Sequence, residues 1–177
     1  RPFLRGWGGY PGSGGLHPGG GGPAGGLGAA RRGAAAAALV AAGHRVLVTG
    51  APSERELTAE VAGADATDLG GKTDFATLAA VMRQARAVVA PNTGPAHVAA
   101  AVGTPVVSLF APVVPAARWA PYGVPHVLLG DQQAACAGSR ARVCPVRGHP
   151  CLDGISDDEI VSAVRRLTRT RGKDRTP

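Results

Sequence analysis

Two short apolar segments joined by an alanine-rich stretch constrain the fold of this chain more than any other feature. Ala87-Val88-Val89 and Val106 to Phe110 have the composition of buried strands, and Val98 to Val102 lies in a helical segment between them. Pro95 suits the first turn of that helix, where its missing N–H is not needed, and Gly103 suits a left-handed exit. Two strands joined through a helix pair in parallel, so this unit predicts a parallel sheet.

The same alternation continues along the rest of the chain. We expect further strands ending at Leu16 and over 45–49, 67–69 and 127–129, and helices over 34–42, 53–62, 73–82 and from 156 onward. Ser53-Glu54-Arg55-Glu56 matches a capping box for the second of these helices, and Phe75, Leu78, Ala79 and Met82 predict the apolar face of the third. Alternating strands and helices predict an α/β fold, with one parallel sheet covered by helices on both faces.

Length and composition indicate one domain. The 177 residues are 45% hydrophobic, which is enough for a single core. Because the start is rich in glycine, we expect residues 1–15 to be a disordered or fragmentary segment. Residues 16–168 are then expected to form the domain, and residues 169–177 a basic, disordered tail. No apolar run is long enough to span a bilayer, and the first residues lack a secretory signal, so we expect a cytoplasmic protein.

The positive charge narrows the choice of partners. Nineteen Lys and Arg against twelve Asp and Glu give a net charge of +7, which favours nucleic acid, an anionic membrane surface or a phosphorylated ligand. Much of the excess lies in residues 165–173, and aromatic residues make up only 4% of the chain. A nucleic-acid partner is therefore not expected, whereas peripheral membrane contact stays open.

Five loops are expected at one edge of the sheet, because ligands of parallel sheets bind beyond the carboxyl ends of the strands. These loops are residues 17–19, 50–54, 70–73, 92–94 and 111–113. The turn before the central helix predicts an anion site, where backbone N–H groups are joined by the hydroxyl of Thr93 and the imidazole of His97. Glu54 is placed either to accept hydrogen bonds from ribose hydroxyls or simply to suit a helix start.

Other motifs indicate a function less strongly. Gly70-Gly71-Lys72-Thr73 resembles a phosphate loop, but Ala66 stands where that motif requires glycine, and no dinucleotide fingerprint follows a strand. Cys136, Cys144 and Cys151, with His149, have spacings that match no compact zinc pattern, so we expect reduced thiols, no metal and no cofactor. The aromatic rings of Trp119 and Tyr122, which follow Arg118, are expected to pack.

Several of these stretches together resemble glycosyltransferase family nine, the ADP-heptose:lipopolysaccharide heptosyltransferase family, in its C-terminal half. The resemblance is carried by residues 43–50, 92–107, 110–112 and 118–123, and by the cysteine loop ending at Leu152. It implies a GT-B architecture, in which two Rossmann-like domains face a cleft. This chain would then be the C-terminal domain, which binds the sugar nucleotide.

The resemblance also implies roles for individual residues. Donor-binding positions would be Asn92, Thr93, Gly94 and His97 at the diphosphate, Glu54 at the ribose, and Gly19 in the first loop. Asn92 stands where the family often has aspartate, and Gly25-Gly26 occupies a place where the family often has a basic residue. The general base is expected in an N-terminal acceptor domain that this sequence lacks, so no catalytic residue and no metal ligand are assigned here.

The expected function is therefore that of a glycosyltransferase donor domain. It would transfer a heptose or related sugar from a nucleotide diphosphate to a lipopolysaccharide-like or other glycan or lipid-linked acceptor, and would be inactive as an isolated half. The alternatives are a truncated, non-catalytic nucleotide-binding remnant and a GT-B nucleotide-sugar epimerase.

Overall fold

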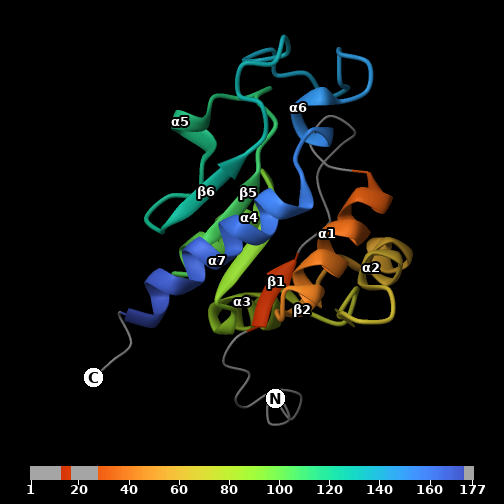
Figure 1. Cartoon of the computed structure of the whole chain (residues 1–177), viewed down its shortest axis with the longest axis vertical. Coiled ribbons are helices and arrows are strands. Elements are labelled where there is room, and N and C mark those ends of the chain that lie inside the picture. The colour runs from red at the N-terminus through yellow and green to blue at the C-terminus, as the bar shows by residue number, and fades with distance from the viewer. Residues whose placement is uncertain (1–12, 17–27, 174–177) are drawn as a thin grey trace.

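The computed structural model describes residues 13–16 and 28–173, which form one parallel sheet with helices on both sides (Figure 1). The strands are β1 Ser13–Leu16, β2 Arg45–Val48, β3 Thr67–Asp68, β4 Ala87–Pro91, β5 Val106–Leu109 and β6 His126–Leu129. The helices are α1 Ala29–Ala41, α2 Arg55–Ala62, α3 Phe75–Gln84, α4 Gly94–Ala101, α5 Ala116–Trp119, α6 Pro150–Asp153 and α7 Asp157–Lys173, with a 3-10 turn η1 over Pro52–Glu54.

The strand order β3-β2-β1-β4-β5-β6 is that of a doubly wound Rossmann sheet. Every neighbouring pair is parallel, so all six carboxyl ends lie at the same edge. The chain winds outward to β3 on one side of β1 and, through β4, to β6 on the other. The order reverses between β1 and β4, and in folds of this kind ligands bind at that point. The predicted α/β fold with a Rossmann-like parallel sheet is confirmed.

The first strand corrects the expected domain boundary. Residues 13–15, placed in the fragmentary N-terminal segment, form β1 together with Leu16 in the middle of the sheet. The space does not demand glycine, since a Cβ on Gly15 would stand 3.4 Å from Cγ2 of Val88, which is an ordinary van der Waals contact. The central position of β1 therefore outweighs the weak strand propensity of its glycines.

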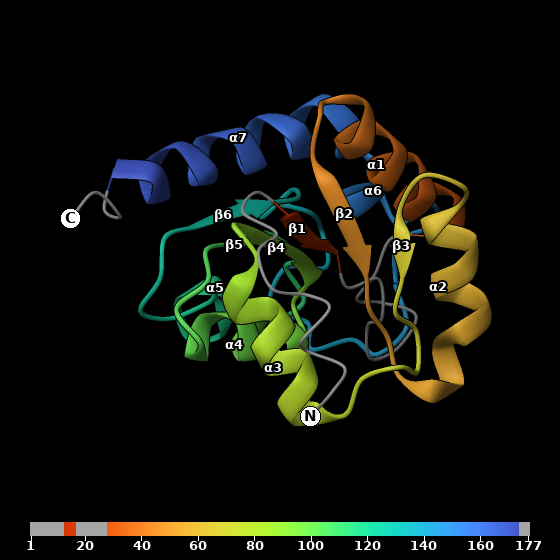
Figure 2. The same ribbon diagram turned by 90° about the horizontal axis from the view of Figure 1, so that it is seen from below.

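Helices cover the two faces of the sheet in separate groups. α1, α2 and α7 lie on one side, and α3 and α4 on the other (Figure 2). The side chains of β4 alternate accordingly: Ala87 and Val89 join the core beneath α1 and α7, whereas Val88 and Ala90 join the core beneath α3 and α4. Burial on both faces explains why the strands consist of continuous apolar runs.

The last helix is longer than the sequence pattern indicated. Ser156 and Glu159 form a reciprocal capping box, in which the Ser156 amide donates to Glu159 Oε2 over 2.7 Å and the Glu159 amide donates to Ser156 Oγ over 3.2 Å. From this start α7 continues to Lys173, so residues 169–173, expected in a disordered tail, are helical. The buried face that holds Ile160, Val164 and Leu167 anchors the preceding turns, and arginine has good helix propensity.

Three aromatic side chains that were expected to pack are exposed. Phe75 is 72% exposed, because Asp74 caps α3 by accepting the amide of Thr77 at 2.7 Å and the first helical residue then points away from the core. Tyr122 is 91% exposed and Trp119 is 50% exposed, so neither aromatic residue packs as predicted.

Within residues 13–16 and 28–173, no helix has the length and apolar character needed to cross a membrane.

Candidate functional site

The loops that follow β2 and β3 are joined at the carboxyl edge of the sheet. The amide of Gly71 donates to the carbonyl of Gly50 over 2.9 Å, and a guanidinium nitrogen of Arg55 reaches the Gly71 carbonyl at 3.4 Å. The close approach requires glycine at position 70, where an added Cβ would lie 2.8 Å from the Cβ of buried Thr58. These contacts fix one side of the edge.

Lys72 is held within its own loop. Its ammonium donates to the Asp68 carbonyl at 2.7 Å and lies 3.7 Å from Asp68 Oδ2. Burial opposes ionisation of Asp68, but the amide of Gly70, the hydroxyl of Thr58 and the charge of Lys72 together hold the pKa of this carboxyl below its usual value. The interpretation that residues 70–73 are not a phosphate loop agrees with this arrangement, since the lysine is engaged with an aspartate.

The turn between β4 and α4 stands beside the reversal of strand order. Thr93 has extended backbone and precedes the first residue of α4, and its own amide donates to the Pro91 carbonyl over 2.8 Å. Gly94 supplies the first N–H of the helix, which has no partner within the helix by position, and Pro95 has no N–H. His97 is exposed one turn further on, while Asn92 and Thr93 are half-buried. The Thr93 hydroxyl donates to the Pro91 carbonyl at 3.5 Å and can still accept a hydrogen bond. A free N–H, this hydroxyl and an imidazole thus lie at the positive end of α4.

Glu54 closes the loop after β2, but not as a capping box over Ser53–Glu56. Its Oε2 accepts the amide of Ala51 over 2.7 Å, and α2 begins one residue later at Arg55. The prediction of the cap is wrong because Pro52 favours a 3-10 turn before the helix. Glu54 follows β2 and the Thr93 turn follows β4, two positions away in the sheet, which places the two strand ends roughly 10 Å apart.

Arg32 is a site residue that the sequence did not indicate. It lies in the first turns of α1, the helix that follows β1, so it too lies at the carboxyl edge. Its Nε is buried and has no hydrogen-bond partner among the described residues. Burial lowers the pKa of its guanidinium, and the carboxylate of Glu54 partly offsets this effect, so these two charges lie near one another. The helix was expected to begin at Ala34, which left Arg32 in a glycine-rich loop and concealed its position.

The cysteine loop places its thiols together on the side of the sheet covered by α7. Cys136 and Cys151 are buried, Cys144 is half-buried, and Cys151 Sγ lies 3.8 Å from Nδ1 of His149. Burial, followed by the neighbouring thiols, raises the pKa of Cys151 to about 11, which favours the protonated thiol over the thiolate that binds metals. Within the described ranges no group of three or more such side chains has a geometry that could hold a metal ion, and the expectation of no metal stays a prediction.

Comparison with known proteins supplies the family. The model of glycosyltransferase family 9 (heptosyltransferase) matches residues 33–149, about two thirds of the chain, including the turn at Asn92–His97. The chain belongs to this family. Lipopolysaccharide heptosyltransferase 3 of Escherichia coli is 38% identical over 79 residues, which make up 41% of this chain and 23% of that protein.

Solved structures of the family share the fold. The family 9 glycosyl transferase of Veillonella parvula superposes with a TM-score of 0.80 at 21% identity, covering 96% of this chain and 50% of that one. The E. coli ADP-heptose lipopolysaccharide heptosyltransferase II gives a TM-score of 0.75 at 20% identity, with the same coverage. This chain therefore spans about half the length of these structures, with the Rossmann-like fold of one half of a GT-B protein.

The structure brings most of the predicted donor-binding residues to one edge. Glu54, Asn92, Thr93, Gly94 and His97 all follow the carboxyl ends of β2 and β4. Gly19, and the Gly25-Gly26 pair, lie outside the described residues. Their roles toward a ligand stay predictions.

Proposed function

We propose that this chain is the donor-binding half of a heptosyltransferase. Its ligand is a sugar nucleotide diphosphate of the ADP-heptose type, and the transferred sugar goes to a lipopolysaccharide-like or other glycan acceptor. The observation that carries the proposal is the start of α4, whose free N–H, hydroxyl and imidazole stand beside the reversal of strand order in a Rossmann sheet. The family match over residues 33–149 supports it.

Each edge residue has a part in this proposal. The Gly94 amide, Thr93 and His97 hold the diphosphate, and Glu54 accepts hydrogen bonds from the ribose about two strand spacings away. The half-buried guanidinium of Arg32 adds a cation near Glu54. Asn92 contributes a neutral amide, which suits a hydroxyl of the donor sugar.

The reaction breaks the bond between the sugar C1 and the diphosphate oxygen and forms a new bond from C1 to an acceptor hydroxyl. Negative charge develops on the leaving diphosphate, where the helix start and the basic side chains stabilise it. The proton of the acceptor hydroxyl goes to a general base in a partner N-terminal domain, because none of the proposed edge residues is assigned that role. We therefore expect the domain formed by residues 13–173 to bind the donor without turnover when it stands alone.

The donor site is tested by titrating the chain with ADP, UDP and GDP while its melting temperature is followed. A nucleotide that binds only the folded state raises the melting temperature as its concentration increases. A melting temperature unchanged by all three nucleotides would contradict the proposal. Sugar transfer by the isolated chain would contradict the assignment of the base to a partner domain.

A pair of histidine variants tests the diphosphate contact. His97→Ala is expected to weaken ADP binding by about tenfold while adenosine binding changes little, because a hydrogen bond to a charged phosphate is lost. His126→Ala is the matched control, since His126 is also exposed but begins β6 at the opposite edge of the sheet. Equal losses for ADP and adenosine would show that His97 acts through packing.

A further inference from the structure

A pocket lies at the carboxyl edge, beyond the end of β5. It has a volume of about 670 Å³ and is lined by Val114, Pro115, Arg118, Trp119 and Arg140. This volume is within the range of small-molecule sites. We call it the Arg118–Arg140 pocket. Among the residues that the structure describes, none of those proposed for the donor lines it.

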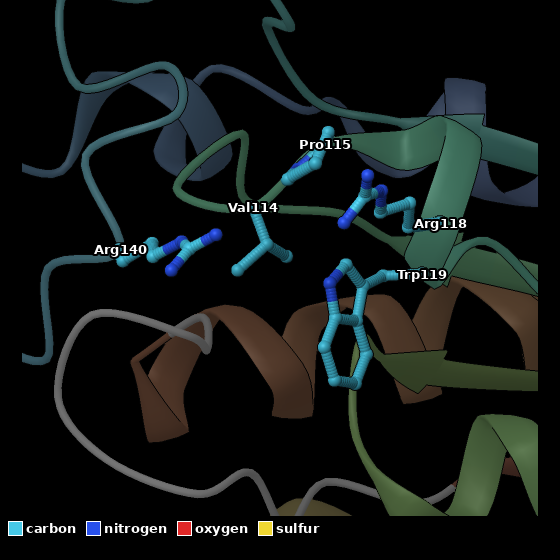
Figure 3. A pocket seen from close by; sticks show the side chains of 5 residues that line it. All are labelled: Val114, Pro115, Arg118, Trp119 and Arg140. Atoms are coloured by element: carbon cyan, nitrogen blue, oxygen red, sulfur yellow. The ribbon is translucent and has the colours of Figure 1, made fainter.

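Two guanidinium groups face this pocket without partners. Figure 3 shows Arg118 and Arg140 approaching the space over Val114 from opposite sides. Both side chains are exposed, and neither makes a hydrogen bond or an ion pair within the described part of the chain. Two unpaired guanidinium groups directed at one space fit an anionic oxygen cluster, a phosphate or a carboxylate, which each can bind through two N–H donors.

The position of Arg140 is enforced by its backbone. The amide of Arg140 donates to the Val113 carbonyl over 2.7 Å, and the amide of Gly138 donates to the Pro112 carbonyl over 2.8 Å, which ties the cysteine loop to the segment after β5. Arg140 has a φ of 56°, a left-handed conformation that a residue with a Cβ rarely adopts. Unfavourable backbone conformations that the surrounding structure enforces are concentrated at ligand sites.

Trp119 gives the pocket an apolar wall. Its indole is 50% exposed and lies on the side of the pocket that also carries Arg118 (Figure 3). An exposed aromatic face next to cationic groups suits a ligand with one apolar face and one charged group. A pyranose ring that carries a phosphate or a carboxylate has this character, because its C–H groups form an apolar face while its substituent is anionic.

We propose that the Arg118–Arg140 pocket is a subsite for an acidic saccharide, a sugar bearing a phosphate or a carboxylate. It follows β5, which neighbours β4 in the sheet, so a ligand held here lies beside the turn proposed for the donor diphosphate. The acidic saccharide is accordingly part of the acceptor. That assignment to the acceptor rests on the proposed function, whereas the binding of an acidic saccharide does not.

Fluorescence of Trp119 tests the subsite directly. The chain has two tryptophans, so a Trp7→Phe background leaves Trp119 as the reporter. We expect glucose 6-phosphate or glucuronate to change its emission in a saturable manner, and neutral glucose to have no effect. The two anionic sugars distinguish a phosphate from a carboxylate. No response to either anionic sugar, or binding of inorganic phosphate as tight as that of glucose 6-phosphate, would overturn the proposal.

Arginine variants complete the test. Arg118→Gln and Arg140→Gly are each expected to weaken binding of the acidic sugar by about tenfold or more, because a charge-assisted contact is lost. Glycine at position 140 accepts the left-handed backbone, so this variant keeps the fold. The matched control is Arg142→Gln, an exposed arginine of the same loop that does not line the pocket. An equal loss in the control would overturn the subsite.

Titration with ADP separates this proposal from the proposed function. If Arg118→Gln and Arg140→Gly leave ADP binding unchanged, the pocket is separate from the donor site, as proposed. If they weaken ADP as much as the acidic sugar, the pocket is part of the donor site and the inference is wrong. Binding of the acidic sugar by a chain that binds no nucleotide would contradict the proposed function and support the subsite.

Discussion

Replacing Arg32 by methionine is expected to change ligand binding and folding stability in opposite directions. The buried Nε of Arg32 has no partner among the described residues, and burial already lowers the pKa of the guanidinium. A hydrogen bond from this group to a charged ligand contributes about 1.5–3 kcal/mol, so its loss should weaken ADP binding by about 10- to 150-fold. Methionine keeps the apolar stem and removes a desolvated charge, so the free energy of unfolding should stay the same or rise.

The neighbouring arginine provides the matched control. Arg31 forms an ion pair with Asp157 at 2.9 Å and donates to the Ile155 carbonyl, which joins α1 to the start of α7. Because this pair is about one third exposed, Arg31→Met should lower the free energy of unfolding by no more than about 1 kcal/mol and leave ADP binding unchanged.

Calorimetric titration with ADP and urea denaturation of the ligand-free chain measure the two effects separately. An ADP affinity for Arg32→Met within about twofold of the parent would refute the role of Arg32, since it corresponds to less than one hydrogen bond. A marked fall in unfolding free energy for Arg32→Met would also refute the reasoning. It would mean that the guanidinium stabilises the fold rather than being kept available for a ligand.

Three further predictions concern parts of the chain outside the donor contacts. Gly70→Ala should lower the free energy of unfolding in urea by about 1–3 kcal/mol, because the added Cβ meets buried Thr58; an unchanged midpoint would show that the loop shifts freely. Burial and two nearby arginines lower the pKa of His44 from 6.5, so the unfolded chain takes up this proton first as the pH falls, and the parent loses free energy of unfolding below pH 6.5. His44→Leu should remove this loss and flatten the dependence of the free energy of unfolding on pH. Iodoacetamide at about pH 8 should modify half-buried Cys144 before Cys151, whose pKa is raised to about 11; equal rates by peptide mass spectrometry would contradict this order.

The predicted elements that agree with the structure are those with long, regular patterns. The continuous apolar runs at β4 and β5 required burial on both faces, and Gly103 ends the intervening helix with a φ of 77°, as expected. The serine and acidic residues from Ser156 onward gave the start of α7 to within one residue. These features depend on neighbours in the sequence, so local patterns were sufficient to predict them.

Some errors occurred where contacts distant in sequence decide the outcome, and others at the starts of helices. The glycines of β1 are poor strand formers, and their place between β2 and β4 is visible only once the sheet is assembled. The exposure of Phe75 depends on the direction in which α3 leaves its cap. The position of Arg32 depended on an early start of α1 that the glycine-rich stretch concealed.

The sequence by itself determined the order of strands and helices and the turn at Asn92–His97, because apolar periodicity and turn residues act over a few neighbouring positions. Only the tertiary structure decided that β1 lies at the centre, that Arg32 approaches Glu54, and that Arg118 and Arg140 face one pocket. The segments that come together in these three cases lie from 22 residues apart in the sequence (Arg32 and Glu54, Arg118 and Arg140) to 73 residues apart (Gly14 and Ala87). These contacts arise because the strands of a parallel sheet all end at the same edge, so loops that are distant in the sequence lie close together there.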